Sequence, residues 1–400
     1  MTKTIIPIGP YHPLQEEPEL FKLYCKGEIV KDVQWVTGYN HRGIEKLSES
    51  KTFEQVFFLV ERICGICSTS HPFAFANCME EIARVEIPDR AKYIRSIIGE
   101  LERIHSHLLW VGLAGHFLGY NNVFMWAWKY REPVLELFEM ITGNRNSYAM
   151  FKIGGVRRDI ENHKIPTIRK VLDTVKEKTD LLTGAVMDDP VIHARTKGVG
   201  ILTKEDIIAY GALGPTARAS GVAIDVRKDD PYAAYASVHW KVITAQEGDV
   251  FAKAEVRLLE MYESISIISQ CLDGLQQIKE GQVDVKVKEI PEGIGTGHAE
   301  APRGEVFHFV KTDGSNYPVR HKIRAPSYMN IATFKKACVG QTISDATIAL
   351  AAVDPCYCCT ERMAYAYDYA SREKILDGNE LVKMGQRKTE KLRRQIKRNR

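Results

Sequence analysis

The sequence contains no apolar segment of the length that a membrane span or a secretion signal requires. A transmembrane helix needs about 20 consecutive apolar residues, and the apolar stretches around Trp110–Phe117 and Ala346–Val353 are far shorter. The first residues, MTKTIIPIGPYHP, include neither the apolar core nor the small-residue cleavage site of a signal peptide. We therefore expect a cytoplasmic chain that reaches a membrane only through partner proteins.

Internal repeats are absent, and the one compositionally biased tract is a basic end. The 400 residues are 44% apolar and 26% charged, as in a globular chain with one large core or two domains. Residues 363–400 hold 11 Lys and Arg against 5 Asp and Glu, a local charge of +6, whereas the other 362 residues have 44 basic and 46 acidic side chains. Because the terminal run GQRKTEKLRRQIKRNR includes no aromatic residue, we expect a solvated end and no nucleic-acid site.

Hydrophobic periodicity predicts a chain that is mainly helical and carries small β elements. In Ala91–Leu118 apolar residues recur at three- and four-residue spacing, with charged residues between them. We expect further helices at Pro133–Thr142, Ile168–Leu182, Asp249–Ile278 and Ile331–Leu350, and strands at Thr4–Ile8, Leu20–Cys25, Glu28–Val36, Glu305–Lys311 and Asn316–Arg324. Residues 184–240 are richer in Gly and Pro and are predicted to be loops and connectors. The prediction is an α+β fold with a central helical bundle and an N-terminal β-hairpin region.

Nine cysteines are the most informative part of the composition. In a cytoplasmic chain thiols stay reduced, so closely spaced cysteines indicate metal or redox chemistry rather than disulfides. Four cysteines are scattered singly and are expected to be buried bystanders: Cys25, Cys78, Cys271 and Cys338. The others include two C-x-x-C steps, Cys64/Cys67 and Cys356/Cys359, and Cys356 lies 289 positions after Cys67. Only the whole fold can bring these four thiols together.

Four cysteine sulfurs form a soft site that suits zinc, nickel or an iron–sulfur cluster. Each C-x-x-C segment can offer one sulfur to a single metal and a second sulfur that bridges to a neighbouring metal. Pro355, directly before Cys356, restrains the second segment. A structural zinc site with four cysteines fits the same spacing about equally well. The residues alone therefore leave the identity of the metal open.

Longer motifs around both cysteine pairs resemble the two signatures of the [NiFe]-hydrogenase large subunit. RICGIC at 62–67 is followed by His71, and DPCYCC occupies 354–359. The segments IGPYHPLQEEP, GELERIHSHLLW, YGALGPTARASG, EAPRG and KIRAPSYMN also agree. From Pro7 to Arg362 the chain resembles the membrane-bound, energy-converting group, which is related to the quinone-proximal subunit of respiratory complex I. The resemblance implies reversible formation of H2 from two protons and two electrons, coupled through ferredoxin-type electron transfer to ion translocation.

The resemblance also implies which residues hold the metals. Cys64 and Cys356, the first cysteines of the two pairs, match terminal ligands of nickel, and Cys67 and Cys359 match the cysteines that bridge nickel to iron. In that family the iron also carries CO and CN ligands. The cysteines left over are too scattered to bind a cluster, so [4Fe-4S] clusters are expected in partner subunits.

Three further residues match positions around the metal pair. Arg303 in EAPRG matches an arginine over the metals, where a fixed guanidinium can polarise a bound hydride or steady the diatomic ligands. Ser327 in RAPS matches a donor to a cyanide, and His71 matches an imidazole that hydrogen-bonds a bridging sulfur. Without the resemblance, they would be interpreted as a structural arginine, a turn serine and a core histidine.

Glu17, in HPLQEEP, matches the carboxylate that carries protons between the metals and solvent. The family implies that a thiolate such as Cys356 takes the proton first and that Glu17 passes it outward. Glu16 is the rival, because the sequence does not show which of the two carboxylates points inward. An exposed pair of charges is the ordinary alternative for both.

Two features depart from the family pattern. Cys358 stands where a serine or another small residue is more usual, and it offers a spare thiol or a shifted ligand pair. The extension after Arg362 resembles a segment that a maturation endopeptidase removes in several relatives. We therefore divide the chain into an N-terminal β region with the proton-carrying Glu (1–50), a helical catalytic domain with both C-x-x-C motifs (51–362) and a basic extension (363–400).

The resemblance implies several partners and a location. We expect a small subunit with the proximal [4Fe-4S] cluster, ferredoxin-like and complex I-like hydrophilic subunits, and antiporter-like membrane subunits. Through them the chain would lie on the cytoplasmic face of the cell membrane. Two alternatives stay open: a complex I-like module that reduces quinone or sulfur without hydrogenase activity, which His12 favours and the four cysteines oppose, and a structural zinc protein.

Overall fold

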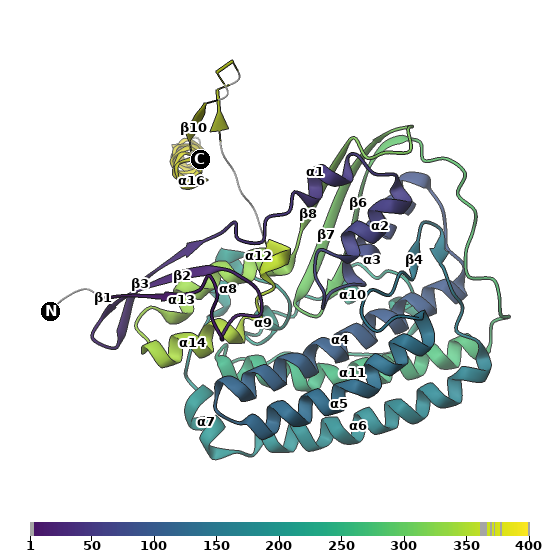
Figure 1. Ribbon diagram of the computed structural model, residues 1–400, viewed down its shortest axis with the longest axis horizontal. Helices are drawn as coiled ribbons and strands as arrows, with labels where there is room; N and C mark the ends of the chain where they lie inside the picture. Colours follow the sequence, from purple (N-terminus) through teal and green to yellow (C-terminus); the bar gives the residue numbers. More distant parts are fainter. Residues whose placement is uncertain (1–3, 361–365, 369, 372, 377, 399–400) are drawn as a thin grey trace.

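Four long helices form the central bundle of the structure, a computed structural model that describes residues 4–360, 366–368, 370–371, 373–376 and 378–398 (Figure 1). They are α4 (Asp89–Phe117), α5 (Asn121–Thr142), α6 (Ile165–Met187) and α11 (Val250–Gln276). Both α4 and α6 contact α5 and α11, so the four helices enclose one core. Buried residues of α4 recur at helical spacing, as at Ile97, Leu101 and Ile104. The predicted α+β fold with a central helical bundle is confirmed.

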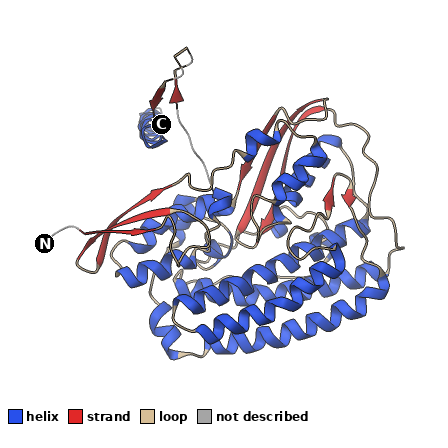
Figure 2. Ribbon diagram, viewed as in Figure 1, coloured by secondary structure: helices blue, strands red, loops and turns tan. Residues whose placement is uncertain are grey.

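Two antiparallel three-stranded sheets lie above this bundle in the view of Figure 2. The N-terminal sheet consists of β1 (Thr4–Ile8), β2 (Leu20–Lys26) and β3 (Ile29–Val36), paired in chain order. The second sheet consists of β6 (Glu292–Ala301), β7 (Gly304–Asp313) and β8 (Arg320–Arg324), also in chain order. Both sheets therefore form from strands that follow one another directly in the sequence.

The remaining elements lie before, between and after these layers in the chain. Before and within the bundle they are α1 (Ile44–Ser48), α2 (Phe53–Glu61), α3 (Ser70–Ala83), β4 (Phe151–Lys152), β5 (Gly155–Val156), α7 (Pro190–Thr196), α8 (Lys204–Tyr210), α9 (Gly214–Arg218) and α10 (Val226–Asp229). Later in the chain they are α12 (Pro326–Asn330), α13 (Phe334–Cys338), α14 (Ile343–Ala352), α15 (Tyr357–Thr360), β9 (Ala366–Tyr367), β10 (Lys374–Leu376) and α16 (Gly378–Arg398). Within the described residues there are also three single turns of 3₁₀ helix: η1 (Asn162–Lys164), η2 (Tyr235–Ser237) and η3 (Ile331–Thr333).

Several predicted boundaries were wrong. The helix expected over Ile331–Leu350 is broken, because the segment at Gly340 turns with φ 93° and its backbone pairs with Val30 of β3. The helix predicted from Pro133 begins at Asn121, so the proline lies inside α5. The expected loops at 184–240 hold the helices α7 to α10, and the glycine-rich strand β6 was missed.

The N-terminal sheet supports the second cysteine segment. Phe21 and Leu23 of β2 share a buried cluster with Phe334 of α13, Leu350 of α14 and Tyr357. The Phe21 ring lies 6.1 Å from the Tyr357 ring, between centroids. Because Tyr357 directly follows Cys356, packing of this sheet fixes where the second cysteine pair lies.

Helix α3 lies directly on strand β6. Gly293, Gly295 and Gly297 follow one another on one face of the strand, and a Cβ atom at each would meet α3. A Cβ at Gly297 would collide with the backbone atoms Ala74 O and Cys78 N, which cannot move aside as a side chain can. This close approach fixes α3, which carries His71, relative to the strand that leads to Arg303.

The C-terminal helix α16 is basic, and its described side chains are largely exposed, including Met384 and Leu392. The predicted boundary after Arg362 lies outside the described residues. Among the helices that the structure describes, none is both long and apolar enough to cross a bilayer.

The contact between α3 and β6 predicts unequal effects of two glycine substitutions. Gly297→Ala should lower the free energy of unfolding by about 1–3 kcal/mol, because the new methyl forces α3 away from the strand. Gly184→Ala is the matched control in α6: its Cβ would meet only Asp188 Oδ2 at 3.9 Å, and the change should stabilise the helix by up to about 1 kcal/mol. Urea unfolding of both variants measures the difference. Equal stability of the two variants would contradict the packing.

Candidate metal centre

Two chain segments that are far apart in sequence meet at the predicted cysteines. The first arm is the loop 62–69 between α2 and α3, and the second arm is 353–360, which follows α14. The Sγ atoms of Cys64, Cys356 and Cys359 all lie within 4.8 Å of one another, and all three residues are buried. Cys356 Sγ lies 3.2 Å from Cys64 Sγ and 2.7 Å from Cys359 Sγ.

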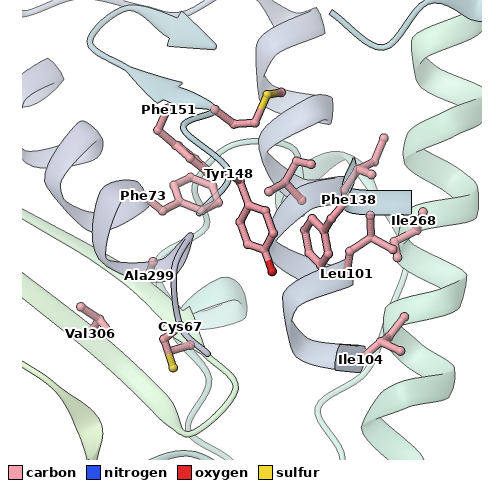
Figure 3. Packing of buried hydrophobic residues seen from close by; sticks show 14 of the residues in the cluster. Cys67, Phe73, Leu101, Ile104, Phe138, Tyr148, Phe151, Ile268, Ala299 and Val306 are labelled. Atoms are coloured by element: carbon pink, nitrogen blue, oxygen red, sulfur yellow. The ribbon is translucent and has the colours of Figure 1, made fainter. Parts of the chain in front are cut away.

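Cys67 stands beside this group of three thiols. Its backbone N–H donates to Cys64 Sγ at 3.3 Å, and its own Sγ lies 3.5 Å from Arg303 Nη1. Figure 3 shows Cys67 at one side of the buried apolar cluster that also includes Phe73 and Tyr148. The site is therefore walled by apolar core on this side. The single cysteines Cys25, Cys78, Cys271 and Cys338 are buried, as predicted.

The four thiols of the site differ in the direction in which their pKa values are shifted. Hydrogen bonds from the neighbouring thiols, together with the charge of Arg303, hold the pKa of Cys64 well below its usual value. The hydrogen bond with Cys64, together with burial, raises the pKa of Cys67, and burial is the main cause that raises the pKa of Cys356 and Cys359. A buried set of soft sulfurs with one favoured thiolate fits a soft divalent cation, whose charge would allow the other thiols to ionise.

Arg303 is the buried positive charge of this site. It lies in the turn between β6 and β7, where its Nη2 is 2.7 Å from Asp354 Oδ1 and its Nε donates to Asp354 O at 2.9 Å. Burial alone would lower the pKa of Arg303, but the charges of Asp354 and the cysteines outweigh burial and raise it. Arg303 thus holds a fixed positive charge against both arms. The sequence motif included Asp354 but did not show that it would be the ionic partner.

Ser327 and Glu17 both hold backbone groups of the second arm. The Cys356 N–H donates to Ser327 Oγ at 3.0 Å, an acceptor role that leaves the hydrogen of the hydroxyl free to donate. The Cys358 N–H donates to Glu17 Oε2 at 2.6 Å. Both residues are therefore at the site, although their predicted roles stay predictions.

The two neighbouring carboxylates differ in position. Glu17 is half-buried, and burial followed by the nearby Cys64 charge raises its pKa. A raised pKa brings the carboxyl closer to the range in which it can both accept and release a proton, as a proton carrier requires. Burial also raises the pKa of Glu16, to about 7, so the pKa shifts do not separate the two carboxylates. Glu16 is more exposed than Glu17 and lines a small cavity with Asp354 and Pro355. The geometry favours Glu17 as the inward carboxylate.

A row of buried histidines leads away from Cys359. His71 Nε2 lies 3.6 Å from Cys359 Sγ, and His71 Nδ1 lies 3.1 Å from His308 Nε2. His308 Nδ1 lies 3.0 Å from His321 Nε2, and His321 Nδ1 lies 3.0 Å from Ser48 Oγ. Burial lowers the pKa of His308, and it lowers that of His321 to about 3, so these two rings stay neutral. The sequence predicted His71 but missed His308 and His321, which lie on β7 and β8 with no local motif.

The family models match two parts of the chain. Residues 42–118 match the nickel-dependent hydrogenase family, and residues 118–290 and 283–362 match the 49 kDa subunit of respiratory-chain NADH dehydrogenase. The first match includes Cys64, Cys67 and His71, and the second includes Arg303 and Cys356. Together the two models span both cysteine arms.

Individual relatives agree with this result. The membrane-bound hydrogenase subunit alpha of Pyrococcus furiosus is 37% identical over 98% of this chain and 95% of its own length. A subunit of the NADH-quinone oxidoreductase of Clostridium beijerinckii is 36% identical over 87% of this chain and 94% of its own length. A solved chain from an archaeal membrane-bound sulfane sulfur reductase superposes with a TM-score of 0.86 at 30% identity, covering 90% of this chain and 98% of that one. The chain therefore belongs to the family that unites the large subunits of [NiFe]-hydrogenases with the 49 kDa subunit of respiratory complex I.

Proposed function

We propose that this chain is the catalytic subunit of a membrane-bound, energy-converting [NiFe]-hydrogenase. The reaction is reversible formation of H2 from two protons and two electrons, linked by ferredoxin-type electron transfer to ion translocation. The observation that carries the proposal is the group of buried thiols from Cys64, Cys356 and Cys359, with Cys67 and Arg303 beside it. A quinone-reducing module has no chemical need for such a group.

The four cysteines fit the metal pair that the family implies. Cys64 and Cys356 would hold nickel, and Cys67 and Cys359 would bridge it to an iron that carries CO and CN ligands. When bound, this pair supplies the two-electron chemistry. Arg303, Ser327 and His71 surround the thiols and would bind or orient the group. The soft donor set and the fixed positive charge support this assignment.

Proton movement is the task of the protein's own carboxylate. Glu17 accepts the Cys358 N–H at Oε2, and burial raises the pKa of its carboxyl, which favours a role as proton carrier. In the proposed route a thiolate such as Cys356 takes the proton first, and a Glu17 oxygen then accepts it and releases it toward solvent. Because Glu17 is half-buried, it stands between the dry site and water.

The chain needs partners for electrons and ions. We propose a small subunit with the proximal [4Fe-4S] cluster, ferredoxin-like and complex I-like hydrophilic subunits, and antiporter-like membrane subunits. This assembly would hold the chain at the cytoplasmic face of the cell membrane. The relatives named above are subunits of membrane-bound or respiratory complexes, which supports a multisubunit assembly. Division of the chain at 50 and 362, and removal of residues 363–400 by an endopeptidase, belong to the same proposal.

A complex I-like module that reduces quinone or sulfur is the second candidate. The match to the sulfane sulfur reductase chain covers 90% of this chain, so the same fold also occurs in a complex named for sulfur chemistry. The two candidates differ in the metal they require and in the product they form, so metal analysis and gas measurement separate them.

The hydrogenase proposal predicts that nickel depends on the thiol group. We expect one nickel per chain in the complex purified without oxygen, and loss of nickel and of viologen-driven H2 evolution in Cys64→Ala and Cys356→Ala. Removing one sulfur takes away a soft ligand from the buried thiol group. Cys338→Ala is the matched control, because Cys338 is equally buried but lies in the cluster under the N-terminal sheet.

Elemental analysis for nickel, iron and zinc, with gas chromatography of H2, measures these outcomes. If the complex purified from cells with intact maturation proteins contained zinc, or no metal, the result would contradict the hydrogenase proposal. Reduction of sulfane sulfur or quinone by the same preparation would then establish the second candidate.

The proton route predicts different effects of two amide substitutions. Glu17→Gln should lower H2 evolution by about 100-fold or more, because the amide still accepts the Cys358 N–H but cannot carry a proton. Nickel content should not change. Glu16→Gln should reduce the rate much less. Turnover and H/D exchange with D2 gas, measured on both variants, test the route; the reverse order of effects would make Glu16 the carrier.

A further inference from the structure

Arg42 lies on the solvent side of the two cysteine arms. It precedes α1 and lines a hollow of about 310 Å³ whose other lining residues include Cys358, Cys359 and Ile63. The residue is exposed, but its guanidinium is not free in solution. The hollow thus gives access to the second arm, and Arg42 stands at the place where both arms reach it.

The guanidinium of Arg42 hydrogen-bonds to both arms. Nη1 donates to Arg62 O at 2.7 Å, and Nη2 donates to Ile63 O at 2.7 Å. Nη2 also donates to Cys358 O at 3.3 Å, across 316 residues of sequence. Ile63 and Cys358 immediately precede Cys64 and Cys359, so each Nη2 bond acts one residue from a thiol.

Only a forked donor can make this set of bonds. A guanidinium presents several N–H groups in one rigid plane, whereas an ammonium is a compact point donor. The Arg42 Nε donates to Asn40 O at 3.3 Å, which fixes the plane from the side of its own loop. Arg42 forms no ion pair with any residue that the structure describes, so its charge is directed at carbonyl dipoles.

Arg42 and Arg303 connect the arms from opposite sides. Arg303 does so from the buried side, through Cys67 Sγ and Asp354. Arg42 does so from the hollow, through backbone carbonyls. The backbone of Cys358 is held at both its polar groups, since Glu17 accepts from its N–H and Arg42 donates to its carbonyl.

We propose that Arg42 is a positioning residue that ties the two cysteine arms together, so that the thiols stand at metal-binding separation before a metal arrives. The inference rests on the metal centre of the proposed function and concerns assembly of the thiol group. Without the tie, the arms would have to be brought together by the metal itself, and part of the binding free energy would be lost to ordering them.

Cobalt binding to the metal-free full chain tests this role without reference to activity. Co²⁺ is titrated without oxygen, and thiolate-to-cobalt charge-transfer absorption reports coordination by the cysteines. We expect Arg42→Ala to bind Co²⁺ about 10–100-fold more weakly than the wild type, the range typical of residues that orient metal ligands. Thermal unfolding of each metal-free variant checks that the fold is retained.

Arg62→Ala is the matched control. Arg62 is an exposed arginine of the first arm, but among the described residues its guanidinium bonds only Phe58 O and Glu61, both on the α2 side. Its removal should leave cobalt affinity within about two-fold of the wild type, because it ties nothing to the second arm. Equal weakening by Arg42→Ala and Arg62→Ala would overturn the proposal, since general loss of surface charge would then explain both.

Arg42→Lys separates geometry from charge. Lysine keeps the positive charge but cannot reach the three carbonyls at once, so we expect it to bind cobalt nearly as weakly as Arg42→Ala. If Arg42→Lys bound Co²⁺ as tightly as the wild type, the proposed role of Arg42 would be overturned. If Arg42→Ala does not fold, Arg42→Lys decides alone by the same criterion. A wild-type chain that binds no cobalt through its cysteines would reject the metal centre, and the tie with it, whereas normal binding by all variants would reject only the tie.

Discussion

The buried ion pair between Arg303 and Asp354 is the contact on which the thiol site depends. One guanidinium joins the β6–β7 turn to the second arm through Asp354, at 2.7 Å, and to the first arm through Cys67 Sγ, at 3.5 Å. Burying two charges is costly, and the cost is offset only when donors and acceptors are paired with good geometry. Loss of Asp354 would leave an uncompensated charge beside the thiols. The pair therefore fixes the β6–β7 turn and both arms to one another at a single guanidinium.

Arg303 is placed by charges that lie deeper in the fold. Arg103 of α4 donates to Glu300 O at 2.7 Å and to Ala301 O at 3.2 Å, which fixes the end of β6. Arg218 of α9 binds the Glu300 carboxylate and also Glu260 of α11, each at 2.7 Å. Burial alone would raise the pKa of Glu260, but Arg218 and His107 hold it well below its usual value. The helical bundle thus presents paired charges, and not only apolar side chains, toward the site.

Sequence patterns predicted the elements and motifs that depend on local periodicity and spacing. They did not identify residues whose partners come from distant segments of the chain. The apolar spacing in Ala91–Leu118 predicted α4 to within two residues, because that period is a property of one helix. The C-x-x-C steps predicted a shared site, and the structure brings Cys64, Cys356 and Cys359 together. His308 and Arg42 were not identified, since neither belongs to a motif and each acquires its partners only when distant segments meet. The predicted helix over Ile331–Leu350 failed for the same reason, because pairing with β3 outweighs local propensity.

The same fold serves relatives named for hydrogen, quinone and sulfane sulfur, so the fold alone does not determine the chemistry. What distinguishes this chain must lie in the side chains at the thiol site and in what holds them. Glu17 and Arg42 both come from the N-terminal region, and both bind the backbone of Cys358. This region also packs Tyr357 into its core. Through Glu17, Arg42 and the packing of Tyr357, the described part of the N-terminal region is therefore part of the thiol site.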